Sequence, residues 1–335
     1  MANVEILIIH LNGAEVIKNC LNSIFDDNPR AKVRLLFNQT TDNSIELVKD
    51  LFPKVTIHSS RRRMGFAESS NFLAKKSKAG YIIFLNNDVV VEKNWARELL
   101  RTIENNRKCV AVQSKIKSFY KRDYFENAGA AGGFIDKYGY PFCRGRIFDN
   151  VEIDNGQYND EIRVFWGCGV SLLVDRNAFV KYGSFDESFF MYAEELDFCW
   201  RINNNGWEVW YSPKSVVYHM GSFSVNDEKI NFKKEYLISK NHLICLIKNN
   251  RLPSLMGLLG GKLGLEIISM IRFPLRRGLP FLISIPSIMH YLFFLKKYHL
   301  NEEAIRMNKR LIYPRSIALD YFIRNKKTFK SLNFG

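Results

Sequence analysis

The sequence lacks several features that mark common classes of protein. Its six cysteines form no CxxC pair and no spacing typical of a metal site, which fits a reducing compartment. A positively charged leader followed by an apolar block and a cleavage site is also missing. The chain instead starts with "VEILIIHLNG", which predicts a buried strand. We therefore expect a structural N-terminus and a cytoplasmic protein.

Acidic residues are scarce in the last third of the chain. Residues 229–335 contain 20 Lys and Arg but 5 Asp and Glu, whereas residues 1–228 contain 29 of each kind. The whole net charge of +15 therefore lies in the tail. A neutral body with a basic, apolar tail favours attachment to an anionic membrane surface over binding to nucleic acid. We expect one globular domain over 1–228 and a basic amphipathic helical region over 229–335.

The stretch 278–295 in this tail contains no charged residue and is flanked by basic pairs at 276–277 and 296–297. Its length reaches the lower limit for a helix that spans a bilayer. Two prolines and a histidine weaken that interpretation and favour a re-entrant segment or a contact in the plane of the membrane. A true span and an apolar interface with another subunit of a homo-oligomer are the alternatives.

The first part of the body alternates strand-like with helix-like stretches. Strands are expected at 4–10, 33–37, 55–58 and 81–85, and helices at 14–25, 43–51 and 67–78. Such an alternation implies an α/β fold with right-handed crossovers and a mostly parallel sheet flanked by helices. Ligands bind these sheets beyond the carboxyl ends of the strands. We therefore expect "HLNG", "NQTTDNS" and "NND" to line one crevice.

The rest of the body is less regular. Residues 109–165 show no clear period, and we interpret them as an extended excursion that carries substrate contacts. Further on, we expect a helix at 194–203 that ends at Asn-Gly. Two strands are expected at 207–211 and 215–219, on either side of Pro213. In the tail, residues 231–250 favour another helix.

Three polar residues interrupt the apolar run "YIIFLNNDVVVE". Asp88 follows the strand that ends near residue 85, so its carboxylate can face the crevice. A turn is the alternative explanation, because Asn and Asp bond their own backbone and tolerate turn geometry.

Glu194, Glu195 and Asp197 form a carboxylate cluster in "YAEELDF", at the start of a predicted helix. Acidic residues in a first helical turn are stabilised by the helix dipole, so capping is one explanation. The many aromatic residues around them favour another. A poorly solvated carboxylate has a raised pKa, which suits a general base.

His219 ends a predicted strand in "SVVYHMGS". A structural histidine is the simpler explanation. Neutral imidazole combined with a carboxylate and substrate oxygens nevertheless suits Mn²⁺ and, less well, Mg²⁺. His219 is therefore a candidate ligand of a divalent cation.

In order and spacing, these stretches resemble the family 2 glycosyltransferases with a GT-A fold. The resemblance rests on "ILIIHLNG", "NQTTDNS", "MGFAESSN", "YIIFLNNDVVVE", "WGCGVSLLV", "GSFDESFFMYAEELDFCWRINNNGW" and "VVYHMGS". It covers about residues 3–225, and the block "GSFDESFFMYAEELDFCWR" is its most specific part. The chain is most similar to the subgroup with rhamnosyl- and galactofuranosyltransferases of bacterial surface polysaccharides.

The resemblance implies a Rossmann-like GT-A sheet and metal-dependent sugar transfer with inversion. It implies that Asp88 and His219 hold Mg²⁺ or Mn²⁺ against the diphosphate of a nucleotide-sugar donor. Glu195 would be the base that takes a proton from the acceptor hydroxyl, with Glu194 and Asp197 beside it in the carboxylate cluster.

Other positions follow from the same resemblance. The nucleotide-sugar is expected to contact Asn12, Asp42, Gly65, Asn71 and Asn87. The sugar and acceptor side is expected at Trp166, Gly167 and Cys168. The acceptor would be a glycan or a lipid-linked molecule used in cell-surface polysaccharide synthesis. A peripheral location on the inner face of the cell membrane would bring the enzyme to it.

The chain departs from the family pattern at four places. Phe37 stands where an Asp usually contacts the base, so the resemblance does not name the nucleotide. Arg63 replaces a common Asn, and Asn86 opens the metal motif where the family has Asp. The pair Glu194–Glu195 takes the place of the usual Glu-Asp.

The leading hypothesis is therefore an inverting, metal-dependent glycosyltransferase. The alternative is a non-catalytic glycosyltransferase-like scaffold or binding subunit, which would hydrolyse no nucleotide-sugar. Binding of nucleic acid through the tail is a third hypothesis. The Leu, Ile and Phe residues interleaved with the basic residues of the tail argue against it.

Overall fold

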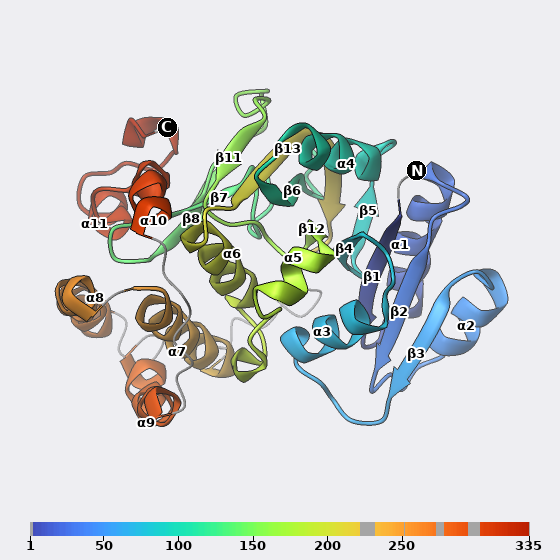
Figure 1. Ribbon diagram of the computed structural model, residues 1–335, viewed down its shortest axis with the longest axis horizontal. Helices are drawn as coiled ribbons and strands as arrows, with labels where there is room; N and C mark the ends of the chain where they lie inside the picture. The colour runs from blue at the N-terminus through green and yellow to red at the C-terminus, as the bar shows by residue number, and fades with distance from the viewer. Residues whose placement is uncertain (1–2, 222–231, 251, 273–277, 294–301, 335) are drawn as a thin grey trace.

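The structure is a computed structural model, and it describes residues 3–221, 232–250, 252–272, 278–293 and 302–334. Within these residues, a nine-stranded sheet has helices on both faces and a five-stranded sheet beside it (Figure 1). The predicted α/β fold with a mostly parallel sheet flanked by helices is thereby confirmed.

The first half of the large sheet is parallel. Its strands are β1 (Val4–His10), β2 (Val33–Asn38), β3 (Thr56–Ser60) and β4 (Tyr81–Asn86). The helices between them are α1 (Ala14–Asp27), α2 (Ser44–Leu51) and α3 (Phe66–Lys76). β4, β1, β2 and β3 lie side by side in that order. Each element starts and ends within two residues of its predicted bounds, because its hydrophobic period is clear.

Both faces of this half are buried, which explains its long apolar strands. Along β4, Ile82 and Phe84 belong to the core on one face, and Ile83 and Leu85 belong to the core on the other. Successive side chains of a strand point to opposite faces, so a strand buried on both faces is apolar throughout. Helix α3 covers the first of these faces, and helix α1 covers the second.

The second half of the sheet mixes antiparallel and parallel pairs. Its strands are β5 (Val89–Val91), β6 (Cys109–Ser118), β11 (Ile162–Val164), β12 (Ser171–Asp175) and β13 (Glu208–His219). Its helices are α4 (Trp95–Asn105), α5 (Arg176–Lys181) and α6 (Glu194–Asn204). The strand order of the whole sheet is β11-β13-β6-β12-β4-β1-β2-β3, and β5 pairs with β13.

Residues 109–165 do not form the irregular excursion that we predicted. They contain β6, a ten-residue strand inside the sheet, and most of the second sheet. The prediction was wrong because β6 buries polar side chains that interrupt its apolar pattern. Gln113 donates to the carbonyl of Gly129 at 3.0 Å, and the hydroxyls of Ser114 and Ser171 lie 2.7 Å apart. Buried polar groups are stable when they are paired in this way.

One strand, β13, replaces the two strands that we predicted on either side of Pro213. Its pairing with β6 shifts register between Ser212 and Val216. Such a bulge accommodates proline, which has no N–H to donate to the ladder. The strand therefore continues without a turn to His219, which it carries to the edge of the crevice.

The tail forms part of the second sheet. The strands of that sheet are β7 (Gly133–Asp136), β8 (Pro141–Cys143), β9 (Arg146–Ile147), β10 (Asn150–Val151) and β14 (Ile312–Tyr313). β14 is thus a short strand within the region that we predicted to be helical. From the tail, the ring of Phe329 packs against Phe134 and Phe142, with centroids 5.3 and 6.1 Å apart. The division of the chain at residue 228 stays a prediction.

Helices make up most of the described tail. They are α7 (Phe232–Asn249), α8 (Leu252–Arg272), α9 (Leu279–Phe293), α10 (Glu302–Asn308) and α11 (Ile317–Phe322). Figure 1 shows α7, α8 and α9 grouped beside α6, on the side away from β3. In the part of the chain that the structure describes, no helix is both long enough and apolar enough to cross a bilayer. The basic pairs at 276–277 and 296–297 lie outside the described residues.

The carboxylate of Asp136 joins the tail to the second sheet. It accepts hydrogen bonds from the backbone amides of Tyr138 at 2.8 Å, Tyr140 at 2.9 Å and Ile317 at 2.9 Å. Asp136 is fully buried, and burial raises its pKa to about 6. Removing this side chain would leave three amides without their acceptor.

We predict that Asp136→Ala lowers the free energy of unfolding by about 3 kcal/mol, because each unpaired buried amide is unfavourable. Chemical denaturation of the full-length protein measures this. Asp26→Ala is the control, since Asp26 is an exposed residue of α1. A loss for Asp136→Ala no larger than that of the control would contradict the prediction.

Candidate active site

Loops that follow β1 and β2 meet at the carboxyl edge of the sheet. The side chain of Asn12 accepts from the amide of Thr41 at 2.9 Å. The carboxylate of Asp42 accepts from the amide of Gly13 at 2.7 Å and from the hydroxyl of Ser44 at 2.5 Å. Burial opposes ionisation of Asp42, but these hydrogen bonds outweigh it and lower the pKa. Asn12 and a charged Asp42 are thus brought together.

His10, the last residue of β1, also belongs to this part of the site. We did not predict a role for it from the sequence. It is fully buried, and its Nδ1 accepts from the amide nitrogen of Asn87 at 2.9 Å. Burial lowers the pKa of His10 to about 4, so the ring is neutral and its Nε2 donates to Ser44 at 2.9 Å. Asn87 is thereby linked through His10 and Ser44 to Asp42.

Asp88 and His219 meet because β5 pairs with the end of β13. His219 Nε2 lies 3.2 Å from Asp88 Oδ1 and 3.3 Å from the amide nitrogen of Asn86. Imidazole nitrogen and carboxylate oxygen suit Mn²⁺, so this pair fits a cation whose other ligands are substrate phosphates and water. Among the described residues, no three His, Cys, Asp or Glu side chains form a cluster that could hold a metal ion.

Glu126 faces the other nitrogen of His219. Its Oε1 lies 3.9 Å from His219 Nδ1, and burial raises the pKa of Glu126. Within the described structure, this Nδ1 is buried without a hydrogen-bond partner. An acidic group behind a ligating histidine orients the ring. No motif in the sequence points to Glu126, because it lies in the stretch 109–165 where we saw no pattern.

Glu194 and Glu195 are the first two residues of α6. Glu195 is partly exposed, whereas Glu194 is 3% exposed. Burial raises the pKa of both carboxyl groups, and repulsion from Glu195 raises that of Glu194 further. Glu195 is therefore the less buried residue of the pair, although its Oε2 atom is buried as well.

A short backbone segment, residues 168–170, connects Glu195 with the polar motif after β4. The amide of Gly169 donates to Glu195 Oε1 at 3.2 Å. The carbonyl of the next residue, Val170, accepts from the amide of Asn86 at 3.1 Å. Consecutive Cα atoms are about 3.8 Å apart. The Glu195 carboxylate and the "NND" motif therefore border the same small region.

The residues that precede this segment are closely packed. A Cβ on Gly133 would come within 2.2 Å of the Trp166 ring, and a Cβ on Gly167 would come within 2.6 Å of Leu172. Cys168 is buried, and burial raises the pKa of its thiol well above the ordinary value. Trp166, Gly167 and Cys168 are thus closely packed, and they directly precede Gly169, whose amide binds Glu195.

Asp197 has a different environment from the two glutamates. It is fully buried, and its Oδ2 accepts from Arg201 at 2.9 Å and from Lys248 at 2.8 Å. Its Oδ1 accepts from the amide nitrogen of Asn249 at 3.0 Å. Both oxygens therefore have donors, and Lys248 and Asn249 come from the tail helix α7. These bonds join α7 to the helix that carries Glu195.

Gly65 and Asn71, at the start of α3 and within it, contact the loop that leads into α6. A Cβ on Gly65 would lie 2.4 Å from the carbonyl oxygen of Phe190, so only glycine fits there. Asn71 donates to the carbonyl of Phe185 at 2.8 Å and accepts from its amide at 3.0 Å. Both residues thus support the loop that leads to Glu195. Their contact with the nucleotide stays a prediction.

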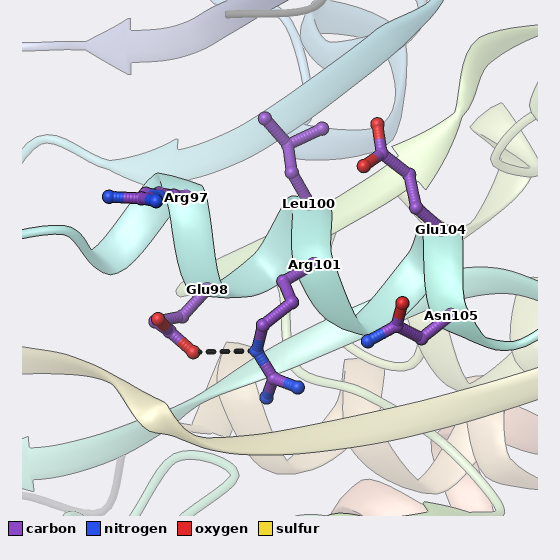
Figure 2. A pocket seen from close by; sticks show the side chains of 6 residues that line it. All are labelled: Arg97, Glu98, Leu100, Arg101, Glu104 and Asn105. Atoms are coloured by element: carbon purple, nitrogen blue, oxygen red, sulfur yellow. Dashed lines mark hydrogen bonds and ion pairs between the residues drawn. The ribbon is translucent and has the colours of Figure 1, made fainter.

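Figure 2 shows a pocket of about 340 Å³ on α4, outside the candidate site. Its lining comes from one helix and consists of Arg97, Glu98, Leu100, Arg101, Glu104 and Asn105. Glu98 accepts from Arg101 across it at 2.9 Å. None of the residues that we predicted for the site lines this pocket.

The fold defines the class of the protein. It is similar to the mannosyltransferase PcManGT from Pyrobaculum calidifontis, in complex with GDP-Man and Mn²⁺, with a TM-score of 0.54. The similarity covers 96% of this chain and 81% of that chain at 12% identity. At this identity it establishes the fold alone, and the fold is that of the GT-A glycosyltransferases.

Residues 5–186 match glycosyl transferase family 2, and the chain belongs to this family. Rhamnosyltransferase WbbL of Escherichia coli (strain K12) is 25% identical over 161 residues, which are 47% of this chain and 57% of that protein. The N-acetylglucosaminyl-diphospho-decaprenol L-rhamnosyltransferase of Mycobacterium tuberculosis (strain CDC 1551 / Oshkosh) is 35% identical over 119 residues, which are 34% and 38%. The chain thus matches little more than half of one relative and less than half of the other.

Proposed function

We propose that this protein is an inverting glycosyltransferase that moves a sugar from a nucleotide-sugar donor to an acceptor hydroxyl. One observation carries the proposal: residues 168–170 border both the Glu195 carboxylate and the motif that contains Asp88, which pairs with His219. A base and a pair of cation ligands thereby share one crevice. Membership of glycosyl transferase family 2 supports the same class of reaction.

Glu195 acts as the general base. Its ionised carboxylate takes the proton of the acceptor hydroxyl while the hydroxyl oxygen attacks the anomeric carbon. The bond from that carbon to the diphosphate oxygen breaks on the opposite face, so the anomeric configuration inverts. Its raised pKa and its contact with residues 168–170, which also bind the motif of Asp88, support this role. Asp197 is bound by two cationic side chains and so holds the start of α6, and the nearly buried Glu194 lies next to the base in the chain.

Asp88 and His219 hold a divalent cation, Mn²⁺ or Mg²⁺, which when bound neutralises the charge that develops on the departing nucleoside diphosphate. Mn²⁺ in the complex of PcManGT supports this assignment. Glu126 faces the other ring nitrogen of His219, Nδ1, and so orients the ring. His219 therefore presents Nε2 to the same side as the Asp88 carboxylate.

The nucleotide side of the crevice comprises Asn12, Asp42 and Asn87. The buried His10 links Asn87 through Ser44 to Asp42. GDP-Man in the complex of PcManGT supports a nucleotide-sugar as the donor. Phe37 is 1% exposed and belongs to the core, so it offers no polar group to a nucleotide base. The nucleotide is therefore recognised by other residues than in relatives with an Asp at this position.

The sugar is a rhamnose or a related hexose, and the acceptor is a lipid-linked molecule or a polysaccharide of the cell envelope. Two rhamnosyltransferases among the relatives support the sugar, and the decaprenol in the name of one supports the acceptor. We assign Trp166, Gly167 and Cys168 to the acceptor side, because they directly precede Gly169, whose amide binds Glu195.

The tail binds an anionic membrane surface on its cytoplasmic side. Apolar side chains of α8 and α9 are exposed to solvent, which is unfavourable unless another surface covers them. They include Leu263, Ile267, Ile268, Leu279, Leu282, Ile283, Ile285 and Met289, each between 41% and 59% exposed. Peripheral binding through these helices would bring the crevice to a lipid-linked acceptor.

We predict that Glu195→Gln reduces sugar transfer by about 1000-fold, because the amide cannot accept the proton. Binding of the donor is retained, since the substitution preserves the shape of the side chain. Turnover and donor affinity, measured on the same preparation, separate these two effects. Glu15→Gln, on the exposed start of α1, is the matched control. Full activity of Glu195→Gln would disprove the role of Glu195 as the base.

The wild-type protein tests the alternative function. A wild type that hydrolyses no nucleotide-sugar in the presence of Mn²⁺ would favour a non-catalytic scaffold subunit.

We also predict an acid limb in the pH dependence of kcat that lies above pH 4.5, the ordinary pKa of Glu. Burial raises the pKa of Glu195, and the base works only when ionised. Activity is therefore complete above the raised pKa and is lost as the pH falls through it. Transfer rates at saturating substrate over the acidic range measure the limb. An acid limb at or below pH 4.5 would be inconsistent with a buried base.

For the membrane, we predict that Leu282→Ser together with Ile283→Ser weakens binding to vesicles of phosphatidylcholine and phosphatidylglycerol by about tenfold or more, because two apolar side chains no longer enter the bilayer. Cosedimentation with these vesicles measures the binding. Substitution is preferable to deletion, since residues 302–334 complete the second sheet. Val180→Ser is the control, because Val180 is 54% exposed outside the tail. Equal losses in the variant and the control would exclude this surface.

A further inference from the structure

The loop that leads into α6 has a backbone conformation that is unfavourable for residues other than glycine. Phe190, Tyr192 and Ala193 have φ angles of 62°, 70° and 69°. These values lie in the left-handed region, where residues with a Cβ are strained. Such a loop persists when its surroundings hold it, and strained residues gather at functional sites. Glu195 follows two residues after the last of them.

One side of this loop rests on α3. The carbonyl of Phe190 lies against Gly65, where a Cβ would come within 2.4 Å, and accepts from the amide of Ala67 at 3.4 Å. The carbonyls of Phe189, Met191 and Tyr192, in contrast, face α7.

Asn241 of the tail helix α7 binds those three carbonyls. Its side-chain nitrogen donates to Phe189 at 3.1 Å, to Met191 at 2.9 Å and to Tyr192 at 2.7 Å. The side chain is fully buried. Carbonyl oxygens only accept hydrogen bonds, so the amide nitrogen must face them. The two N–H donors of this single side chain are thus shared among three carbonyls of the strained loop.

Other residues of α7 bind the same loop on either side of Asn241. Lys240 donates to the carbonyl of Ser188 at 2.9 Å. Lys248 donates to the carboxylates of Asp186 at 2.7 Å and Asp197 at 2.8 Å. Helix α7 therefore follows the chain from residue 186 into α6.

We propose that Asn241 is a positioning residue for Glu195: it holds the left-handed loop ahead of α6 and so aims the Glu195 carboxylate. The proposal rests on the proposed function. Only one oxygen of the Glu195 carboxylate is held by a hydrogen bond: Oε1 accepts from the amide of Gly169, whereas Oε2 has no hydrogen-bond partner among the described residues. The direction of the carboxylate depends on the backbone at the start of α6.

The test compares the full-length wild type with Asn241→Ala and Asn241→Ser. Turnover and KM for the donor, the pH dependence of kcat, and hydrogen exchange of residues 186–197 are measured for each. We expect Asn241→Ala to lower kcat by about 100-fold with KM for the donor changed by about twofold or less, because a misplaced base affects the chemical step and not donor binding.

The pH profile separates positioning from general packing. When the loop relaxes and water reaches Glu195, the acid limb of kcat moves to lower pH, and residues 186–197 exchange faster. Asn241→Ser keeps one donor and gives a smaller effect, and it replaces the alanine variant if that variant does not fold. Asn250→Ala is the control. Asn250 directly follows α7, and its side chain donates to the carbonyl of Leu246 within α7 and not to the loop.

Two results would overturn the proposal: unchanged kcat and exchange in a folded Asn241 variant, or a lower kcat with the acid limb at the wild-type pH. If the wild type itself transfers and hydrolyses no sugar, the proposed function fails. Hydrogen exchange still decides whether Asn241 holds the loop in that case. Faster exchange supports the clamp, and unchanged exchange contradicts it.

Discussion

The pairing of the buried Asp197 carboxylate between α6 and α7 is the interaction on which the rest of the structure depends. A carboxylate without access to water is stable only when charges and donors surround it. Arg201 supplies one cation from α6, and Lys248 supplies the second from α7. The helix that carries Glu195 is therefore joined to the first helix of the described tail by an ion pair. Helix α7 packs in turn on α9, where Phe281 and Ile288 are buried against it. The exposed apolar face of α9 is thereby connected to the catalytic helix.

The sheet supplies the other half of the site through its topology. Parallel strands β1, β2 and β4 bring three polar loops to one edge, as is usual for ligand sites on such sheets. Antiparallel pairing of β5 with β13 then adds His219 next to Asp88. β12, which runs antiparallel to β4, brings residues 168–170 to the same edge. The crevice is thus the place where the parallel and antiparallel halves of the sheet meet.

The sequence was sufficient where the signal is local. The strands and helices up to residue 86 follow a clear hydrophobic period, and the order of the motifs identified the family. It was insufficient where buried polar groups find distant partners. Gln113 and Ser114 interrupt the pattern of β6, so an inner strand was interpreted as a loop. Glu126, His10 and Asn241 carry no motif, because their importance arises from contacts with residues far away in the chain.

The central claim is that the crevice binds the diphosphate of a nucleotide-sugar together with a divalent cation. The most direct measurement is the thermal stability of the purified full-length protein with a panel of nucleoside diphosphates and nucleotide-sugars, each with and without Mn²⁺. A ligand that binds the folded state raises the Tm. We expect at least one nucleotide to raise it, and to raise it further with Mn²⁺. A Tm that no member of the panel changes, with or without Mn²⁺, would contradict the claim.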